Sequence, residues 1–497
     1  METTQHRDEL KVSVVVATYN SSAFLHRLVD SLLAQTMPAD EFEVILVDDG
    51  STDDTGAVVT ALAKRHANFV ARQIPNSGWS GRPRNVGIGV ARGRYVFIAD
   101  HDDRLEPEAL EKLYERAEQN GADVVVGREV GHGFGVPRQL FRRNVDDARL
   151  GDDPLLVLLT PHKLFRRSMI EEHGIRFPEG RRRLEDHFFV MQAYFHARRI
   201  SILADYPCYH WVRRDDGGNA TDRWVDPVEY YASLRDVLDI VDRHTEPGSF
   251  RDRLYAHWYR SKMLHRLRGR RFVKPRDRDL TLFAEIRRLA LERFPPTVDE
   301  HLPPRYRILS RAVRAGRTDL VGELGLFEHG LRVDARPLTV EPGRWRMGLA
   351  LEAALTDASG ATVSFLRDGD RLTWDPPAGV RDGLQLRDGD LDMTDAVRSA
   401  RLAVVLRHRG ESVEHEVSVP LGHRPEEGPR VHIAGRVNLS LDLSTMAAGE
   451  PLPDGIWDLF VNVHVAGWGV MGRLPGMPLT KKDPDRITEP FVTDRGN

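Results

Sequence analysis

The sequence has a single cysteine, no long hydrophobic run and almost no excess of charge of either sign. Cys208 alone cannot form an intramolecular disulfide, and no group of cysteine and histidine residues has the spacing of a zinc site. The first ten residues, METTQHRDEL, lack the apolar segment of a secretion signal, and no run of about 18 apolar residues occurs. These absences predict a protein without a membrane span, located in the reducing cytoplasm, either free or peripherally associated with the inner face of the membrane.

The net charge of −4 combines 71 basic with 75 acidic residues. A nearly neutral total argues against a protein coated with positive charge for nucleic acid, although it leaves room for a local basic patch. No groove-reading module or single-strand stacking motif is evident, so we expect no nucleic-acid partner. The length of 497 residues and the hydrophobic content of 41% predict a soluble protein with two or three domains.

The first half of the chain alternates short β-branched segments with amphipathic segments, which is typical of an α/β domain. We place this domain at residues 1–225 and expect a mostly parallel sheet with helices on both faces. A serine, Ser21 or Ser22, is the expected N-cap of the first helix. The predicted strands are residues 12–17, 43–47, 69–73, 95–99, 123–126 and 202–204, and the predicted helices are residues 24–33, 55–65 and 85–91.

The sequence pattern changes twice in the second half of the chain. Residues 226–328 have helical spacing of apolar residues among many arginines, which predicts a helical extension. Residues 329–497 have short alternating segments separated by Gly, Pro and Asp, the pattern of an antiparallel β-sandwich. In the segment 457–465 the apolar residues recur at every second position and share one face.

Two acidic clusters directly follow predicted strands. Asp48 and Asp49 end one strand, at the edge where open α/β sheets place their ligand crevice. The cluster Asp100, His101, Asp102 and Asp103 follows another strand. Closely packed carboxylates repel one another, and Mg²⁺ or Mn²⁺ is the usual compensation. The alternatives are turn or helix-cap residues for the first cluster and a solvated acidic loop for the second.

Four segments, in this order, carry a family resemblance: VSVVVATYNSSAFL, VILVDDGSTDDT, NSGWSGRPRNVGIGVARGRYVFIADHDD and RRRLEDHFF. They resemble the family-two glycosyltransferases with the GT-A fold, over about the first 220 residues. The resemblance implies an inverting, metal-dependent transfer of a sugar from a nucleotide-diphosphate donor. Two departures are Ala17, where the family usually has Pro, and His101, where a small residue is usual. Neither departure removes a functional group, and His101 is best interpreted as a residue that lines the pocket.

The resemblance also implies roles for individual residues. Asp49 would contact the base, flanked by Ala17 and Tyr19, and Asn76 and Arg84 would contact the nucleotide. Asp100 and Asp102 match the DxD metal motif, for which the cofactor is Mn²⁺ or Mg²⁺, and Asp100 also faces the donor.

Asp186 matches the catalytic base of the family. Inversion by single displacement needs one carboxylate that takes the acceptor proton, so a lone positioned Asp suffices. Glu185 is expected to orient the acceptor or the base. Without the resemblance, a helix N-cap or an ion pair with one of the arginines at 181–183 would be the favoured interpretation of Asp186.

Basic residues further along the chain are candidates for anionic ligands. His210 and Arg213 are expected near the donor diphosphate, with Arg214 as the alternative cation and a structural role as the alternative for His210. In the basic stretch that follows, Arg260, Lys262 and Arg266 are expected to hold an anionic polymer, unless the stretch is only a solvated face.

The whole arrangement is similar to the polyribitol-phosphate β-N-acetylglucosaminyltransferases that decorate wall teichoic acid. This narrower resemblance rests on the domain order, on the Glu-Asp motif and on DGIWDLFVNVHV. It implies a UDP-sugar donor carrying N-acetylglucosamine or another hexose, a polyol-phosphate acceptor, and a homo-oligomer, by analogy a trimer. The alternatives are a glycosyltransferase for another cell-surface polysaccharide or glycolipid, and a carbohydrate-binding or assembly protein without catalysis.

Overall fold

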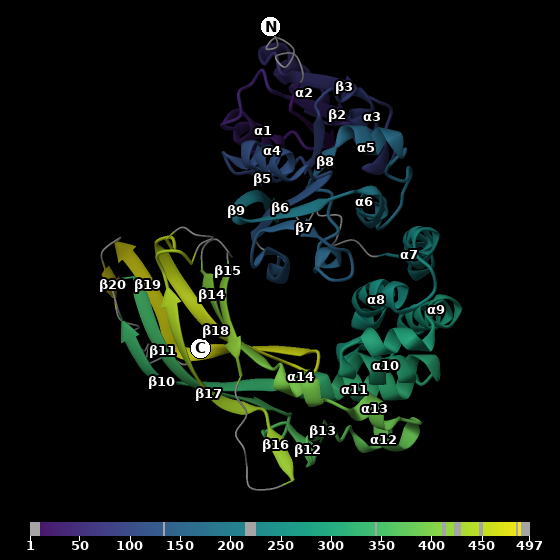
Figure 1. Cartoon of the computed structure of the whole chain (residues 1–497), viewed down its shortest axis with the longest axis vertical. Helices are drawn as coiled ribbons and strands as arrows, with labels where there is room; N and C mark the ends of the chain where they lie inside the picture. The colour runs from purple at the N-terminus through teal and green to yellow at the C-terminus, as the bar shows by residue number, and fades with distance from the viewer. Residues whose placement is uncertain are drawn as a thin grey trace. The chain divides into compact units, whose positions relative to one another are not determined.

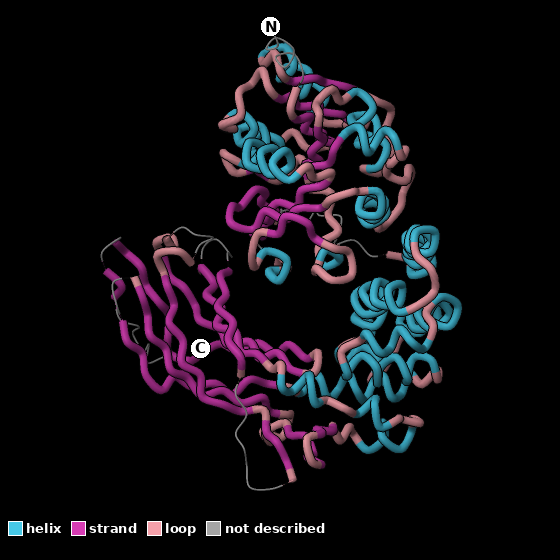
Figure 2. Tube along the Cα trace, viewed as in Figure 1, coloured by secondary structure: helices cyan, strands magenta, loops and turns pink. Residues whose placement is uncertain are grey.

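The computed structural model of the chain forms two compact units, Met1–Arg251 and Asp252–Asn497. It describes residues 10–132, 135–213, 225–342, 345–409, 414–421, 429–446, 451–483 and 486–488. The chain is coloured from its N-terminus to its C-terminus in Figure 1. Helices and strands alternate along the first unit, whereas in the second unit most helices precede the strands in sequence. Figure 2 distinguishes the helices, in cyan, from the strands, in magenta.

The first unit is built on one mixed sheet with the strand order β3-β2-β1-β4-β8-β6-β9-β5, in which β7 also pairs with β9. The first four strands of this order are parallel to one another, as are β6 and β9. β8 runs antiparallel to both of its neighbours, and β5 and β7 run antiparallel to β9. The strands are β1 (Val12–Thr18), β2 (Phe42–Asp48), β3 (Phe69–Gln73), β4 (Tyr95–Asp100), β5 (Arg104–Leu105), β6 (Val124–His132), β7 (Val145–Ala148), β8 (Leu164–Arg166) and β9 (Ile200–Val212).

The predicted α/β class with a mostly parallel sheet is confirmed, and β5, β7 and β8 are its antiparallel strands. β9 is much longer than the strand predicted at residues 202–204, and it includes His210. The helices of this unit are α1 (Leu25–Leu33), α2 (Thr55–Arg65), α3 (Gly81–Val90), α4 (Ala109–Asn120), α5 (Arg167–Glu172), α6 (Glu185–His196) and α7 (Pro227–His244), with short 3₁₀ turns at η1 (Arg138–Phe141) and η2 (Leu155–Val157).

Two helix starts differ from the prediction. The N-cap of α1 is Phe24, which makes no side-chain cap, so the expectation of a serine cap is wrong. The reason is that the hydroxyl of Ser22 donates instead to Asp53, at 2.8 Å. Helix α3 begins at Gly81, earlier than predicted, where a Cβ atom would lie only 2.2 Å from the carbonyl oxygen of Pro178. The missing side chain therefore lets this helix start against the neighbouring backbone.

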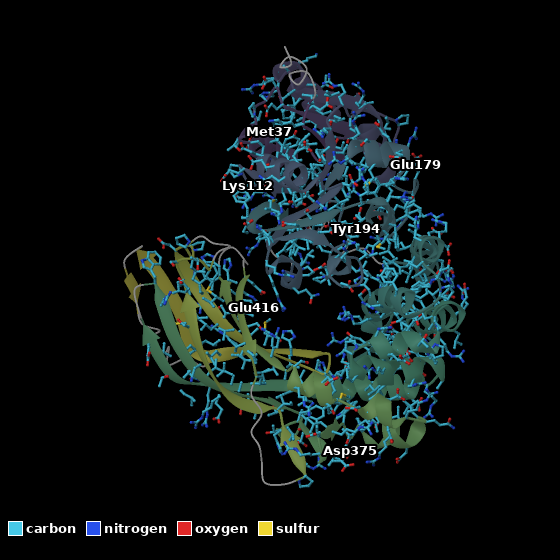
Figure 3. All side chains as sticks on the ribbon, in the orientation of Figure 1. Met37, Lys112, Glu179, Tyr194, Asp375 and Glu416 are labelled. Carbon is cyan, nitrogen blue, oxygen red and sulfur yellow. The ribbon has the colours of Figure 1, made fainter. Side chains whose placement is uncertain are left out.

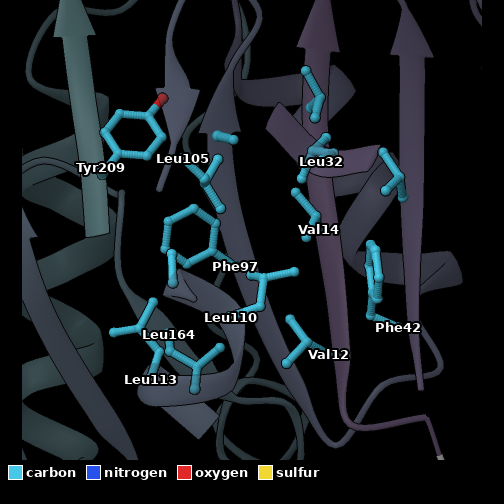
Figure 4. Close-up of a cluster of buried hydrophobic side chains, with 14 of the residues drawn as sticks. Val12, Val14, Leu32, Phe42, Phe97, Leu105, Leu110, Leu113, Leu164 and Tyr209 are labelled. Carbon is cyan, nitrogen blue, oxygen red and sulfur yellow. The ribbon is translucent and has the colours of Figure 1, made fainter. Parts of the chain in front are cut away.

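Apolar side chains from both the sheet and its helices fill one core. Val12 and Val14 of β1 are fully buried and belong to the same cluster as Phe97 of β4 and Leu110 of α4 (Figure 4). Tyr209 of β9 packs at one end of this cluster, with its ring centroid 5.9 Å from that of Phe97. The core thereby fixes the ends of β1, β4 and β9 relative to one another, and these ends carry the polar residues discussed below.

Helix α7 completes the first unit. Asp226 caps its N-terminus by accepting hydrogen bonds from the backbone of Val228 and Glu229, at 2.8 and 3.2 Å. Its last residue, His244, stacks on Phe195 of α6 with 4.8 Å between ring centroids. The compact first unit therefore extends past residue 225 and includes α7.

The second unit begins with helices and ends in antiparallel sheets. Its helical elements are α8 (Ser249–Trp258), η4 (Tyr259–Met263), η5 (Leu264–Leu267), η6 (Gly269–Phe272), α9 (Asp277–Arg293), η7 (Pro296–His301), α10 (Pro304–Arg314) and α11 (Thr318–Gly330). Three short helices, α12 (Ala378–Gly383), α13 (Asp388–Leu391) and α14 (Thr394–Arg398), lie among the strands in sequence. Within the described parts of the chain, no helix combines the length and the apolar character that crossing a bilayer requires.

The strands of the second unit form three antiparallel sheets, β10-β11-β17, β13-β12-β16 and β15-β14-β18-β19-β20. Alternate residues of β18 from Trp457 to Val465 are buried, which confirms the single apolar face predicted from the sequence. The strands are β10 (Arg332–Pro342), β11 (Arg346–Thr356), β12 (Ser364–Asp368), β13 (Arg371–Thr373), β14 (Arg401–His408), β15 (Glu414–Pro420), β16 (Arg430–His432), β17 (Ala434–Asp442), β18 (Gly455–Val465), β19 (Trp468–Asp483) and β20 (Arg486–Thr488).

Candidate active site

The two acidic clusters predicted from the sequence meet at one edge of the first unit's sheet. β1 lies between β2 and β4, and all three strands run parallel. In this register Thr18 pairs with Asp48 and Ala17 pairs with Asp100. The carboxyl ends of these strands therefore bring the two clusters together, at the edge where α/β sheets bind their ligands.

Asp49 organises the loop that follows β3. Its side chain is buried, and its two carboxylate oxygens accept hydrogen bonds from the backbone amide and the hydroxyl of Ser77, both at 2.9 Å. The side-chain amide of Asn76 donates to the carbonyl oxygen of Asp49, also at 2.9 Å. Ala17 is half-buried and Tyr19 is 46% exposed at the end of β1. The structure thus joins two of the predicted donor residues, Asp49 and Asn76, directly, and it adds Ser77, which the sequence analysis missed.

Arg84 lies between two carboxylates from different elements. Its side chain is only 4% exposed, and its guanidinium donates to Asp100 of β4 and to Asp186 of α6, both at 2.7 Å. Burial opposes its charge, but the carboxylates of Asp186 and Asp100 hold the pKa of Arg84 above its usual range. Predicted at the nucleotide, Arg84 is in this structure a buried cation that joins the predicted base to the first predicted metal ligand.

Glu185 and Asp186 occupy the first turn of α6. The N-cap of this helix is Leu184, so Asp186 is not the cap that the sequence offered as an alternative. Its ion-pair partner at 2.7 Å is Arg84, not one of the neighbouring arginines proposed as an alternative. Carboxylates in the first turn of a helix are favoured by the helix dipole.

The carboxyls of Glu185 and Asp186 both have raised pKa values. Burial and then the charge of Asp186 raise the pKa of Glu185 to about 7. Burial also raises the pKa of Asp186, against the opposing effect of Arg84. Glu185 accepts hydrogen bonds from the indole of Trp79 at 2.7 Å and from the hydroxyl of Ser80 at 3.2 Å. A carboxylate with a raised pKa is a stronger base, which suits Asp186 to proton abstraction.

A set of oxygen and nitrogen donors lies beside Arg84. One side-chain atom each from Asp100, Asp103 and His162 all lie within 4.8 Å of one another. Two carboxylates and an imidazole are suitable donors for a divalent cation such as Mn²⁺ or Mg²⁺, so these residues fit the implied cofactor. Asp102, the second residue of the DxD motif, is half-buried, and its carbonyl oxygen accepts from Arg27 at 3.4 Å.

The two aspartates of this set differ in their electrostatics. Against the effect of burial, Arg84 and then His162 hold the pKa of Asp100 below its usual range. Burial raises the pKa of Asp103 well above its usual range, and its carboxylate accepts from the backbone amide of Val212 at 2.8 Å. The sequence analysis missed His162, because it stands between Pro161 and Lys163 in a segment with no motif of its own.

His210 and Arg213 lie at the end of β9. The imidazole of His210 is buried, with Nε2 2.7 Å from Glu106 and Nδ1 2.8 Å from the ring of His132. Burial lowers its pKa, although Glu106 opposes this effect. Arg213 is exposed, and its backbone amide donates to the carbonyl of His132 at 3.0 Å. Arg214 lies outside the described residues.

The predicted acceptor residues belong to the second unit. Arg260 and Lys262 lie in η4, which is a π-helical turn, and Arg266 lies in η5. Burial, followed by the charge of Arg266, lowers the pKa of Lys262 to about 8. π-helical turns inside helices frequently mark functional positions.

Sequence comparison divides the chain into three matched regions. Residues 13–206 match the glycosyl transferase family 2 profile, and residues 227–325 match the glycosyl transferase TarS linker domain. Residues 387–470 match TarS beta-glycosyltransferase C-terminal domain 1. The first region contains every residue of the site around Arg84.

Three characterised relatives are similar over about half of this chain. The poly(ribitol-phosphate) beta-N-acetylglucosaminyltransferase TarP of Staphylococcus aureus is 30% identical over 262 residues, which span 50% of this chain and 80% of TarP. The chain belongs to glycosyltransferase family 2. The poly(ribitol-phosphate) beta-glucosyltransferase of Bacillus spizizenii is 36% identical over 47% of this chain, and TarS of S. aureus is 34% identical over 50%. The matched region spans only 37% and 44% of those two relatives' own lengths.

Solved structures extend this family-2 relationship. The crystal structure of S. aureus TarS 1-349 in complex with UDP-GlcNAc has a TM-score of 0.58 and 28% identity, covering 64% of this chain and 90% of that one. A longer S. aureus TarS structure covers 98% of this chain and 86% of its own, with a TM-score of 0.57 and 22% identity. The likeness to the longer structure concerns the fold alone, and it includes the antiparallel sheets of the second unit.

Proposed function

We propose that this family-2 protein transfers a hexose from a UDP-sugar to a hydroxyl group of a poly(ribitol-phosphate) chain, with inversion at the anomeric carbon. The observation that carries the proposal is the pair of ion pairs made by Arg84, one with the predicted base Asp186 and one with Asp100, a predicted metal ligand. Relatives named as poly(ribitol-phosphate) glycosyltransferases and a TarS complex with UDP-GlcNAc support the acceptor and the donor.

The chemistry assigned to the site is a single displacement. Asp186 takes the proton of the acceptor hydroxyl while that oxygen attacks the anomeric carbon from the face opposite UDP. The bond between the sugar and the phosphate breaks, and the electron pair leaves with the UDP diphosphate. Arg84 keeps Asp186 in place, and Glu185 lies beside it on the same helical turn.

The donor and its cofactor are assigned to the sheet edge. Asp49, Asn76, Ala17 and Tyr19 are proposed to hold the nucleoside, and Arg213 the diphosphate. A divalent cation, Mn²⁺ or Mg²⁺, would be held by carboxylates of the 100–103 segment and would supply charge stabilisation for the leaving diphosphate. The oxygen-rich donor set at Asp100 and Asp103 supports this assignment.

The acceptor is assigned to the basic residues of the second unit. Arg260, Lys262 and Arg266 are suited to ribitol phosphates because guanidinium and ammonium groups pair with phosphate oxygens. We also propose that the chain acts as a homo-oligomer at the inner face of the membrane, with residues 329–497 contributing to assembly or polymer binding. Light scattering on the purified full chain measures the subunit number.

Transfer assays test the function directly. Purified chain is incubated with Mn²⁺, poly(ribitol-phosphate) and either UDP-N-acetylglucosamine or UDP-glucose, because the relatives are named for both sugars. The expected product is β-linked, which the anomeric coupling in NMR identifies. An α-linked product would contradict the single displacement. Transfer only to another polysaccharide or a glycolipid would contradict the acceptor.

A further inference from the structure

His162 is a buried side chain that the transfer mechanism does not use. It is 5% exposed, and its Nε2 atom lies 3.3 Å from Asp100 Oδ2. Neither ring nitrogen forms a well-aligned hydrogen bond within the described part of the chain. A buried imidazole beside a carboxylate needs either a proton or a metal ion between the two groups.

A second buried carboxylate lies on the opposite side of the His162 ring. Glu129 of β6 has a fully buried side chain, and its Oε2 atom lies 3.7 Å from His162 Nδ1. The other oxygen of Glu129 accepts from the hydroxyl of Thr160 at 2.8 Å and lies 3.9 Å from the ammonium of Lys163. The side chain of Tyr194, on α6, is labelled in Figure 3. Burial, followed by the charge of Glu129, holds the pKa of its hydroxyl well above the usual range. The carboxyl group of Glu129 is thus held in place behind the imidazole.

The plane of the imidazole is fixed as well. The His162 ring stacks on Tyr209 with 4.2 Å between centroids and 22° between planes. The hydroxyl of Tyr209 in turn accepts a hydrogen bond from the backbone amide of Asp100 at 2.8 Å. The ring therefore points one nitrogen at Glu129 and the other at Asp100. Metal sites often contain such a triad, in which a carboxylate binds one ring nitrogen of a histidine and thereby orients the other nitrogen toward the metal.

The donor atoms lie close enough together to share one divalent cation. Two donors at about 2.2 Å from the same ion lie about 3.1 Å apart when they are adjacent. His162 Nε2 and Asp100 Oδ2 are separated by 3.3 Å, and Asp103 offers a further oxygen within 4.8 Å of the donor atoms of both residues.

We propose that His162 is a nitrogen ligand of the divalent cation, together with Asp100 and Asp103, that Glu129 orients its ring, and that this imidazole makes the site prefer Mn²⁺ over Mg²⁺. The proposal rests on the metal-dependent function proposed above and adds the identity of the ion. Mg²⁺ favours oxygen ligands and retains its waters, whereas an imidazole is a better ligand for transition metals.

Pulsed electron paramagnetic resonance of Mn²⁺ tests the ligand without any turnover. Mn²⁺ is added to the full chain alone and then with UDP. The expected spectrum has the ¹⁴N coupling of a directly bound imidazole, which changes when histidine is ¹⁵N-labelled and disappears in His162→Asn. Absence of the coupling in both wild-type samples would overturn the proposal. So would its persistence in His162→Asn, since His101 or another histidine would then be the ligand.

Calorimetry with Mn²⁺ and Mg²⁺ tests the preference. Wild-type protein should bind Mn²⁺ more tightly than Mg²⁺, and His162→Asn should lose most of that difference. Glu129→Gln should weaken Mn²⁺ binding about 10- to 100-fold while the nitrogen coupling remains, as is usual for an orienting carboxylate. The exposed His26→Asn serves as the matched control and should bind both ions like the wild type.

Equal affinities for the two ions in the wild type would overturn the preference. The wild-type spectrum and Glu129→Gln keep the proposal testable if His162→Asn does not fold. Sugar transfer by a protein whose bound Mn²⁺ has no nitrogen coupling would overturn this inference alone and leave the proposed function intact.

Discussion

The guanidinium of Arg84 donates a 2.7 Å hydrogen bond to the carboxylate of Asp186. These residues are far apart in sequence and come from α3 and α6. The same guanidinium binds Asp100 of β4, so one buried cation sets the separation between a predicted base and a predicted metal ligand. The positions of the proton acceptor and of the cofactor are therefore coupled through a single side chain.

Replacing Asp186 separates catalysis from binding. Asp186→Asn keeps the shape of the side chain but cannot take the acceptor proton, so transfer should fall by about 10²- to 10⁴-fold. Donor affinity, measured by calorimetry with UDP-sugar, should be retained. Asp30→Asn on the exposed face of α1 is the matched control. Equal transfer rates for Asp186→Asn and wild type at the same folded fraction would show that Asp186 is not the base.

Replacing Arg84 should make stability depend on the metal. Removing one partner of a buried ion pair costs about 3–5 kcal/mol. The cost should be smaller here because the side chains of Asp100 and Asp186 are 38% and 31% exposed. Arg84→Met should unfold at a lower temperature than the wild type. Mn²⁺ should raise the unfolding temperature of Arg84→Met by more than it raises that of the wild type, because the ion then supplies the missing positive charge. The same Mn²⁺ effect on both proteins would contradict this coupling.

The raised pKa of Glu185 predicts a pH-dependent stability. Burial and the charge of Asp186 raise the pKa of this carboxyl from 4.5 to about 7 on folding. The folded state thus binds the proton more tightly, and this contribution to stability is complete below pH 4.5 and is lost as the pH rises to about 7. Glu185→Gln should therefore gain in unfolding temperature relative to the wild type on going from pH 5 to pH 8. The exposed Glu172→Gln should not, and an unchanged difference for Glu185→Gln would contradict the assignment.

The contact between Asp49 and Ser77 predicts a graded loss of donor binding. Asp49→Asn removes a charged acceptor of two hydrogen bonds, each worth about 1.5–3 kcal/mol when one partner is charged. Affinity for UDP should fall by at least about tenfold, since 1.4 kcal/mol is a factor of ten. Ser77→Ala removes only the hydroxyl and should cost less. Unchanged UDP affinity in Asp49→Asn, measured by calorimetry, would count against its role at the base.

A truncation tests where donor binding resides. A cut near residue 329 would separate helices that contact later residues, because Arg317 donates to the carbonyl of Gly383 at 3.0 Å and Glu323 accepts from the amide of Gly379 at 3.1 Å. A fragment that ends after α7 avoids this damage. Residues 1–248 should fold and bind UDP with the affinity of the full chain. A folded fragment without UDP binding would show that the second unit contributes to the donor site.

Local sequence patterns determined most of the fold. The β-branched segments of the first half became the parallel strands, and the alternation from Trp457 to Val465 became one buried face of β18. The acidic clusters at Asp49 and Asp100 could be placed at one sheet edge because parallel strands share the direction of their carboxyl ends. These features depend on the spacing of residues within one element and on the direction of its strand, and the periodicity of the sequence predicts both.

Only the tertiary structure decided the partners of the site residues. Arg84, expected at the nucleotide, lies between Asp100 and Asp186, and His162 joins Asp100 and Asp103 without any motif that marks it. The antiparallel insertion of β8 between β4 and β6 brings the preceding residue pair, His162 and Lys163, beneath the sheet edge. Such contacts join residues far apart in the chain. Their distances depend on how several elements pack together, and a single sequence carries no local signal for that packing.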